Sequence, residues 1–257
     1  MIVIRSQQIQ QLRNAALLHF EQLMVIHLNH YAEQHCKVIG EEMVREVVRL
    51  GINRAEEYGF TCRGPVRFYL ELMFNLGSHF DTDPQYPWAA DTLNDQKIND
   101  QMGRSEILYN RAMDYFTKVA GPDNLYAQQA LHKIFLSVQQ LQPPLELLNV
   151  AQSIQTQLAQ SYPQKYEYVG DEAFQKLIAE GVETSKAYQC GFPRGVYLVI
   201  LLMITLGHGI TDDPLYPWVK RTLKDPLISN SENRINRLEH KAITYLNHAI
   251  EYLAKRA

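Results

Sequence analysis

The feature that most constrains this chain is a hexapeptide that occurs twice. "DPQYPW" begins at Asp83, and "DPLYPW" begins at Asp213, 130 residues later. Moving the second half of the chain back by 130 positions aligns residues 170–245 with residues 40–115 without a gap, and many glycines, leucines and tyrosines match. A register shared across so many expected element boundaries indicates the internal duplication of a unit of roughly 115 residues.

The residues between the prolines and glycines have the apolar spacing of helices. Apolar side chains recur at steps of three and four through residues 5–31, 40–59, 64–76 and 103–119. None of these stretches alternates apolar and polar residues as a half-buried strand does. The first stretch predicts one long amphipathic helix with apolar residues at Ile9, Leu12, Ala16, Phe20, Leu23, Ile26 and Leu28. The sequence therefore predicts an all-α protein.

Proline and glycine also predict how the chain is divided. A Gly-Pro pair at residues 121–122 and a Pro-Pro pair at residues 143–144 are expected to end helices, since proline lacks an amide donor and clashes with the preceding turn. We expect residues 1–120 and 143–257 to form two helical-bundle repeats, joined by a connecting helix in residues 121–142. Short connections favour one packed body, and we expect pseudo-twofold symmetry between its halves.

The two hexapeptides are predicted to form structural corners. The aspartate of each caps the following turn, and the proline after it, like the second proline three residues later, has a φ angle preset for the first position of a helix. The second proline restricts the tyrosine before it, and the tryptophan buries a large ring against the preceding helix. An exposed aromatic recognition patch is the alternative. The residues concerned are Asp83, Pro84, Tyr86, Pro87, Trp88, Asp213, Pro214, Tyr216, Pro217 and Trp218.

Charge and composition argue against several partners and compartments. The chain has 25 basic and 28 acidic side chains, a formal net charge of -3, so nucleic acid and anionic membranes are not expected partners. The longest apolar run, residues 196–207, is about a dozen residues long, whereas a transmembrane helix needs about 20, so it predicts a buried helix and no membrane insertion. Three widely spaced cysteines favour reduced thiols and the bacterial cytoplasm.

Histidine and cysteine form no recognisable metal or nucleophile motif. No paired C-x-x-C or H-E-x-x-H spacing occurs, and the candidate ligands do not recur as a set in the second copy. Two cysteines lie near arginines that could lower a thiol pKa, but they stand two positions apart in the shared register. We therefore expect no metal and no cofactor. The candidates weighed are His27, His30, His35 and Cys36 for a metal, and Cys62 and Cys190 for a nucleophile.

The segment "GSHFDTD" contains the one acid–base cluster that we consider. His79 and Asp81 in this segment could serve a helical hydrolase or transferase. Its counterpart "GHGITDD" keeps only the aspartate that begins the hexapeptide, and capping explains that residue more simply. The chain also contains no G-x-S-x-G elbow, glycine-rich phosphate loop or dinucleotide fingerprint. We therefore predict no catalytic residues, with an enzyme using His79 and Asp81 as an alternative.

The segments "GINRAEEYGF" and "LGSHFDTDPQYPWAADTL" resemble a group of small all-helical bacterial proteins. Members of that group are often encoded in type VI secretion effector cassettes, and the resemblance covers residues 40–118. The second copy departs from it at Gln189 and Thr211, where the first copy has Gly59 and Asp81. The resemblance implies a role in handling a secreted toxin, and it brings no catalytic residues with it.

These observations together predict a non-catalytic protein-binding protein. The resemblance favours an immunity protein that neutralises a cognate toxin by steric occlusion. An effector chaperone or loading adaptor for the secretion spike is the first alternative, and a scaffold that binds two partners is another. No binding residue is predicted. The acidic side chains Glu41, Glu42, Glu46, Glu56 and Glu57 fit a basic toxin, but an ordinary solvated helix face is the favoured interpretation of them.

Overall fold

The structure is a computed structural model that describes residues 6–141 and 147–255. The chain is 79% helical and has no strand within these ranges, which confirms the predicted all-α class. The helices of the first half are α1 (Ser6–Tyr31), α2 (Glu33–Ile39), α3 (Glu41–Glu57), α4 (Arg63–Leu76), α5 (Pro87–Leu93) and α6 (Gln101–Tyr115). A π-helical turn (Phe116–Ala120) and a 3-10 turn (Pro122–Asn124) lead to α7 (Leu125–Gln139). The second half contains α8 (Leu147–Ser161), α9 (Pro163–Val169), α10 (Asp171–Ala187), α11 (Pro193–Leu206), α12 (Pro217–Leu223) and α13 (Ser231–Ala254).

The helices of the two halves keep the spacing of the hexapeptides. Each of α2, α3, α4 and α5 begins and ends 130 residues before its counterpart in the series α9 to α12; for example, α4 covers residues 63–76 and α11 covers 193–206. Helix α6 also begins 130 residues before α13, but α13 continues to Ala254. The two halves therefore contain the same order of helices at the same register.

One glycine in each half allows two helices to pack closely. A Cβ atom on Gly51 of α3 would lie 2.3 Å from Cδ2 of Leu70 in α4. A Cβ atom on Gly181 of α10 would lie 2.3 Å from Cγ1 of Ile200 in α11. Neither glycine interrupts its helix, so both serve the close approach of neighbouring helices.

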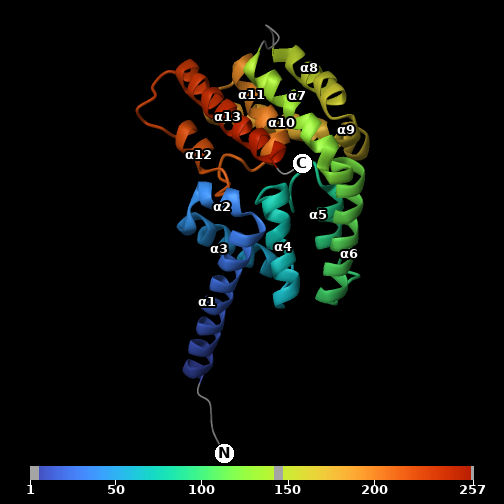
Figure 1. Ribbon diagram of the computed structural model, residues 1–257, viewed down its shortest axis with the longest axis vertical. Coiled ribbons are helices and arrows are strands. Elements are labelled where there is room, and N and C mark those ends of the chain that lie inside the picture. The colour runs from blue at the N-terminus through green and yellow to red at the C-terminus, as the bar shows by residue number, and fades with distance from the viewer. Residues whose placement is uncertain (1–5, 142–146, 256–257) are drawn as a thin grey trace, which may run out of the picture.

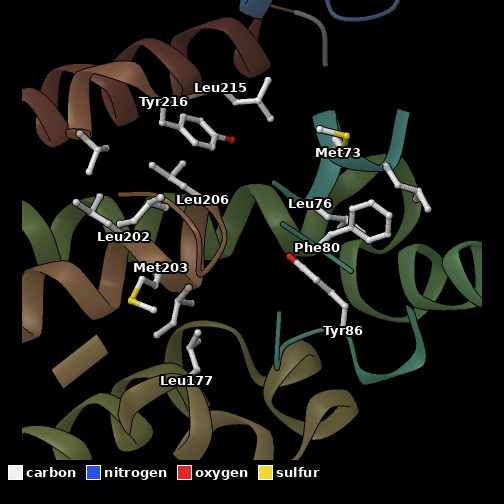
Figure 2. Packing of buried hydrophobic residues seen from close by; sticks show 14 of the residues in the cluster. Met73, Leu76, Phe80, Tyr86, Leu177, Leu202, Met203, Leu206, Leu215 and Tyr216 are labelled. Atoms are coloured by element: carbon white, nitrogen blue, oxygen red, sulfur yellow. The ribbon is translucent and has the colours of Figure 1, made fainter. Parts of the chain in front are cut away.

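A continuous hydrophobic core runs through both halves. Figure 2 shows side chains from the end of α4 and the loop after it, such as Leu76 and Phe80, together with side chains from α11, such as Met203 and Leu206. Helix α7 packs along α13 and also contacts α8 and α11, so the connecting helix belongs to the body of the second half (Figure 1). The proline pair expected to end this helix, at residues 143–144, lies outside the described residues.

Helix α1 extends away from the rest of the chain (Figure 1). Its extent agrees with the predicted helix of residues 5–31, but only Phe20 and Leu28 of the apolar residues on which that prediction rests are buried. The others are exposed, and the buried residues of α1 begin only at Phe20. Among the described helices, none is both long and apolar enough to cross a membrane.

Candidate functional site at the junction of the two halves

The hexapeptides connect a long helix to a short one in each half. Pro87 and Pro217 occupy the first turn of α5 and α12, where proline loses no hydrogen bond. The prediction that the earlier prolines take this position is wrong, because Pro84 and Pro214 lie in the turn before the helix. Each half therefore carries a rigid corner of the same construction.

Asp83 makes the predicted local cap and also bonds the other half of the chain. Its Oδ1 atom accepts a hydrogen bond from the backbone amide of Gln85 at 2.8 Å. Its Oδ2 atom accepts one from the backbone amide of His208, also at 2.8 Å. Asp83 is 2% exposed, so both oxygens are satisfied inside the protein.

Asp213 repeats this arrangement in the opposite direction. Its Oδ1 atom accepts from the amide of Leu215 at 2.8 Å, and its Oδ2 atom accepts from the amide of Ser78 at 2.8 Å. The Ser78 hydroxyl adds a third hydrogen bond, to Oδ1 at 2.6 Å. The position of Ser78 in the first half corresponds to that of His208 in the second. Each half thus supplies a loop amide to the buried aspartate of the other.

Two glycines bring the backbones of the halves into contact at the same place. A Cβ atom on Gly77 would lie 2.7 Å from the carbonyl oxygen of Leu206, and one on Gly207 would lie 3.1 Å from that of Leu76. Their φ angles are +97° and +104°, in a region that favours glycine. Burial raises the pKa of Asp83 and of Asp213, while the amides that donate to them act in the opposite direction.

The hexapeptide tyrosines also contact the opposite half. The Nζ atom of Lys165 in α9 lies 5.5 Å from the ring centroid of Tyr86. The ring of His35 in α2 lies 5.5 Å from that of Tyr216, edge-on. Residues 35 and 165 occupy the same position in the shared register, so the junction is reciprocal in its aromatic contacts as well.

The tryptophans brace the helix that follows each corner. Trp88 is 7% exposed, and its ring lies 5.9 Å from that of Tyr115 in α6. Trp218 is half-buried, and its ring lies 5.8 Å from that of Tyr245 in α13. The aromatic neighbours therefore belong to the following helices, where the sequence had suggested the preceding ones. Neither indole is an exposed recognition surface.

Asp81 is enclosed in a hydrogen-bonded cluster of the first half. The guanidinium of Arg54 donates to both carboxylate oxygens, at 2.5 and 3.1 Å, and the hydroxyls of Tyr58 and Tyr69 donate at 3.0 and 2.8 Å. Burial lowers the pKa of His79 to about 4, which keeps this imidazole neutral. With four hydrogen bonds to the Asp81 carboxylate and only 1% of the residue exposed, the arrangement favours a structural role.

Exchanging Asp81 for asparagine is expected to destabilise the protein strongly. The change leaves Arg54 without its carboxylate in a largely buried position, and the loss of one partner of a buried ion pair typically costs about 3–5 kcal/mol. Urea denaturation would measure it. The matched control is Asp212→Asn, because Asp212 forms exposed ion pairs with two lysines and should contribute less than about 1 kcal/mol. Equal unfolding midpoints for the two variants would contradict the structural role of Asp81.

The candidate metal ligands and thiols do not assemble into a site. His27 pairs with Glu71 at 2.8 Å, whereas His35 lies at the junction. Burial raises the pKa of Cys36 to about 11. Burial also raises the pKa of Cys190, opposite to the activation that a nearby arginine suggests for it. No group of three histidine, cysteine or carboxylate side chains suited to a metal occurs in the described part of the chain.

The junction is the most elaborately bonded region that the two halves share, and it involves the hexapeptides directly. Its buried aspartates, glycines and aromatic rings hold the halves together. In comparisons with known proteins, the chain matches no family model, no curated protein and no solved structure.

Proposed function

We propose that this chain is a non-catalytic protein-binding protein that neutralises a secreted bacterial toxin by covering a functional surface of it. The observation that carries this proposal is the exposed apolar side of α1. Leu12 is 64% exposed, Ile26 is 58% exposed and Ile9 is 42% exposed. A contiguous apolar surface of this kind on a folded protein commonly marks a site of protein association.

The exposed side of α1 has the spacing of a helix-packing seam. Ile9, Leu12, Ala16, Leu23 and Ile26 follow one another at steps of three, four, seven and three residues, as the a and d positions of a heptad do. With about 100° per residue, this stripe lies roughly 140° around the helix from the side that packs on the body. A partner helix can therefore approach it without displacing the core.

The second half indicates that folding does not require this apolar side. Helix α8 ends at Ser161, 130 residues after the end of α1, so the two helices correspond in the shared register. Ser153 and Thr156 in α8 stand where α1 has Leu23 and Ile26. The same position in the fold thus accepts a polar outer side, and the apolar one in α1 suits a further contact.

The charge of α3 indicates the character of the partner. Helix α3 packs directly on α1 and carries exposed acidic side chains at Glu42, Glu46, Glu56 and Glu57. In α10, the counterpart of α3, lysines pair with the glutamates of the exposed surface, in the pairs Lys176–Glu172 and Lys186–Glu183. The first half therefore carries four exposed glutamates on the helix that packs against α1, which suits a toxin with a basic rim.

We also infer that the two halves arose by duplication and are related by a pseudo-twofold axis. The shared helix boundaries support this, as do the reciprocal bonds from Asp83 to the His208 loop and from Asp213 to the Ser78 loop. Interfaces with a twofold axis are reciprocal in this way. A residue of one half contacts a residue of the other half, and the counterparts of these two residues make the same contact. The cytoplasm of the producing bacterium is the proposed place of action, since the chain contains only free cysteines.

The double variant Leu12→Ser and Ile26→Thr is expected to weaken toxin binding at least about tenfold, because burying one large aliphatic side chain contributes about 1.5–3 kcal/mol. The second change installs the residue that α8 has at this position. The experiment co-expresses each variant with the product of the neighbouring gene and measures growth rescue, co-purification and Kd. Since both side chains are more than half exposed, the melting temperature should stay close to that of the parent.

Leu227→Lys is the matched control. Leu227 is 89% exposed in the second half, and Lys97 occupies the corresponding position of the first. This variant should rescue growth as the parent does. Full rescue and unchanged Kd for the α1 variant would refute the proposed surface. A neighbouring product that is harmless alone, but is exported only with this chain, would replace toxin neutralisation by the chaperone or adaptor role.

A further inference from the structure

A cavity of about 360 Å³ lies beside the junction, between the two halves and the connecting helix. The first half contributes Tyr86 and Tyr115 to its wall, the start of the connecting helix contributes Gln128, and the second half contributes Tyr162 and Lys165. A volume of this size is at the lower end of the range for small-molecule sites, which occur preferentially where separate parts of a structure meet.

Lys165 lines this cavity with an ammonium group that has few hydrogen-bond partners. The residue is 4% exposed, and its Nζ atom donates one hydrogen bond, to the carbonyl oxygen of Ile204 at 3.1 Å. An ammonium group has three donors, and Lys165 uses one of them in this bond. Burial lowers the pKa of Lys165 to about 8, and the charge of the Asp83 carboxylate acts in the opposite direction without forming an ion pair within the described ranges. A buried ammonium with one hydrogen bond and no carboxylate in direct contact is unfavourable.

The corresponding position of the first half shows that the fold does not need a cation here. His35 stands at that position, and its Nε2 atom lies 3.1 Å from the carbonyl oxygen of Leu215. Its ring packs edge-on against Phe74 and Tyr216. Burial lowers the pKa of His35, which favours its neutral form. A neutral side chain therefore completes the junction on that side, whereas the second half places an ammonium beside a cavity.

The other residues of the cavity wall indicate what kind of chemical group an anionic ligand would carry. Leu76, Leu131 and Ile134 give the cavity an apolar side, and the rings of the tyrosines add aromatic surface. The Tyr162 hydroxyl is already engaged, since it donates to the carbonyl oxygen of Val119 at 3.1 Å. An inorganic anion would leave the apolar wall uncovered, whereas a carboxylate on a small ring or a short alkyl chain would contact both sides.

We propose that this cavity binds a small organic monocarboxylate, with its carboxylate on the Nζ atom of Lys165 and its apolar body against the α4 and α7 side of the wall. Binding would bring a carboxylate into direct contact with the ammonium and would tie together both halves and the connecting helix. This ligand site is independent of the proposed toxin contact, because the outer side of α1 contributes nothing to the cavity.

Thermal melting and calorimetry with benzoate and hexanoate test the proposal, using benzamide and hexanamide as uncharged probes of the same shape. The acids are expected to raise the Tm of the full chain and the amides are not, because a ligand stabilises the state that it binds in proportion to RT ln(1 + [L]/Kd). Lys165→Met should abolish the response to the acids, with at least a tenfold loss of affinity, because it removes the ammonium that would hold the carboxylate.

Lys224→Met is the control variant, because Lys224 also lies over a tyrosine ring, 5.8 Å from the centroid of Tyr188, but its side chain is 51% exposed. It should respond to the acids as the parent does. The comparison of acids with amides on the unaltered chain stands even if Lys165→Met does not fold. The proposal is overturned if neither acid changes the Tm at 100-fold excess over a millimolar Kd, if the amides act equally, or if Lys165→Met keeps the response.

Discussion

Gly77→Ala is expected to lower the free energy of unfolding by about 2–6 kcal/mol, combining backbone strain at a positive φ angle with the cost of overpacking. The new Cβ atom would lie 2.7 Å from the carbonyl oxygen of Leu206, a backbone atom that cannot rotate aside. The two halves would have to separate locally, which would also strain the hydrogen bond from Ser78 to Asp213. Urea denaturation and the thermal midpoint would measure the loss.

Gly59→Ala is the control that separates the cost of backbone strain from the cost of a steric clash. Gly59 has a φ angle of +76°, but a Cβ atom there would meet nothing within 4 Å. Gln189 occupies the corresponding position of the second half with a φ angle of +58°, so the fold accepts a side chain at this place. Gly59→Ala should therefore cost only about 1 kcal/mol. If Gly77→Ala unfolds at the same urea concentration as Gly59→Ala, the close contact of the two backbones is not what holds the junction.

Trp88→Ala is expected to lower the free energy of unfolding by about 3–5 kcal/mol, the usual cost of truncating a buried tryptophan. The indole fills the space between the corner and α6, where it contacts the rings of Tyr86 and Tyr115. Equilibrium denaturation gives the size of the loss, and near-UV circular dichroism reports whether the remaining aromatic rings keep their packing.

The second tryptophan provides the comparison. Trp218 occupies the same position but is only half-buried, so Trp218→Ala should cost less than Trp88→Ala. A Trp88→Ala protein with the parent's unfolding midpoint, or a larger loss from Trp218→Ala, would contradict the view that these rings act mainly by packing. In that case the alternative interpretation, an aromatic surface for recognition, would regain support.

Much of the helical organisation could be predicted from the sequence, because the information lies in neighbouring residues. Apolar spacing predicts α3, α4 and α6, the Gly-Pro pair marks the start of the segment that contains α7, and proline marks the first turn of α5. The short helices α2 and α9 were not predicted, since seven residues span only two turns and carry little periodic signal. Periodicity also cannot tell which of two apolar sides faces the core, so the exposure of Leu12 and Ile26 in α1 was not anticipated.

The junction was harder to predict, since its partners are distant in sequence and partly backbone. The aspartates of the hexapeptides were predicted as local caps, which they are, but their second partners are amides 125 and 135 residues away that any residue type can supply. The partners of Asp81, Arg54 and Tyr69, are 27 and 12 residues distant in the sequence. Because the sequence does not show that these residues bond to Asp81, a catalytic role for Asp81 remains open at that level. The residues around Lys165 in the sequence do not indicate that it is buried beside a cavity. Only the comparison with His35, at the same position of the shared register, indicates that this lysine differs from its counterpart.

The crossed hydrogen bonds of the two buried aspartates have a consequence for how this chain can open. The backbone amide of Ser78 donates a hydrogen bond to the Asp213 carboxylate, and the backbone amide of His208 donates one to the Asp83 carboxylate. If either loop opens, a buried carboxylate of the opposite half loses a hydrogen bond that water cannot replace. Local opening in one half is therefore unfavourable for the other half. We expect the two halves to unfold together in one cooperative transition, although the chain is long enough for two separate domains.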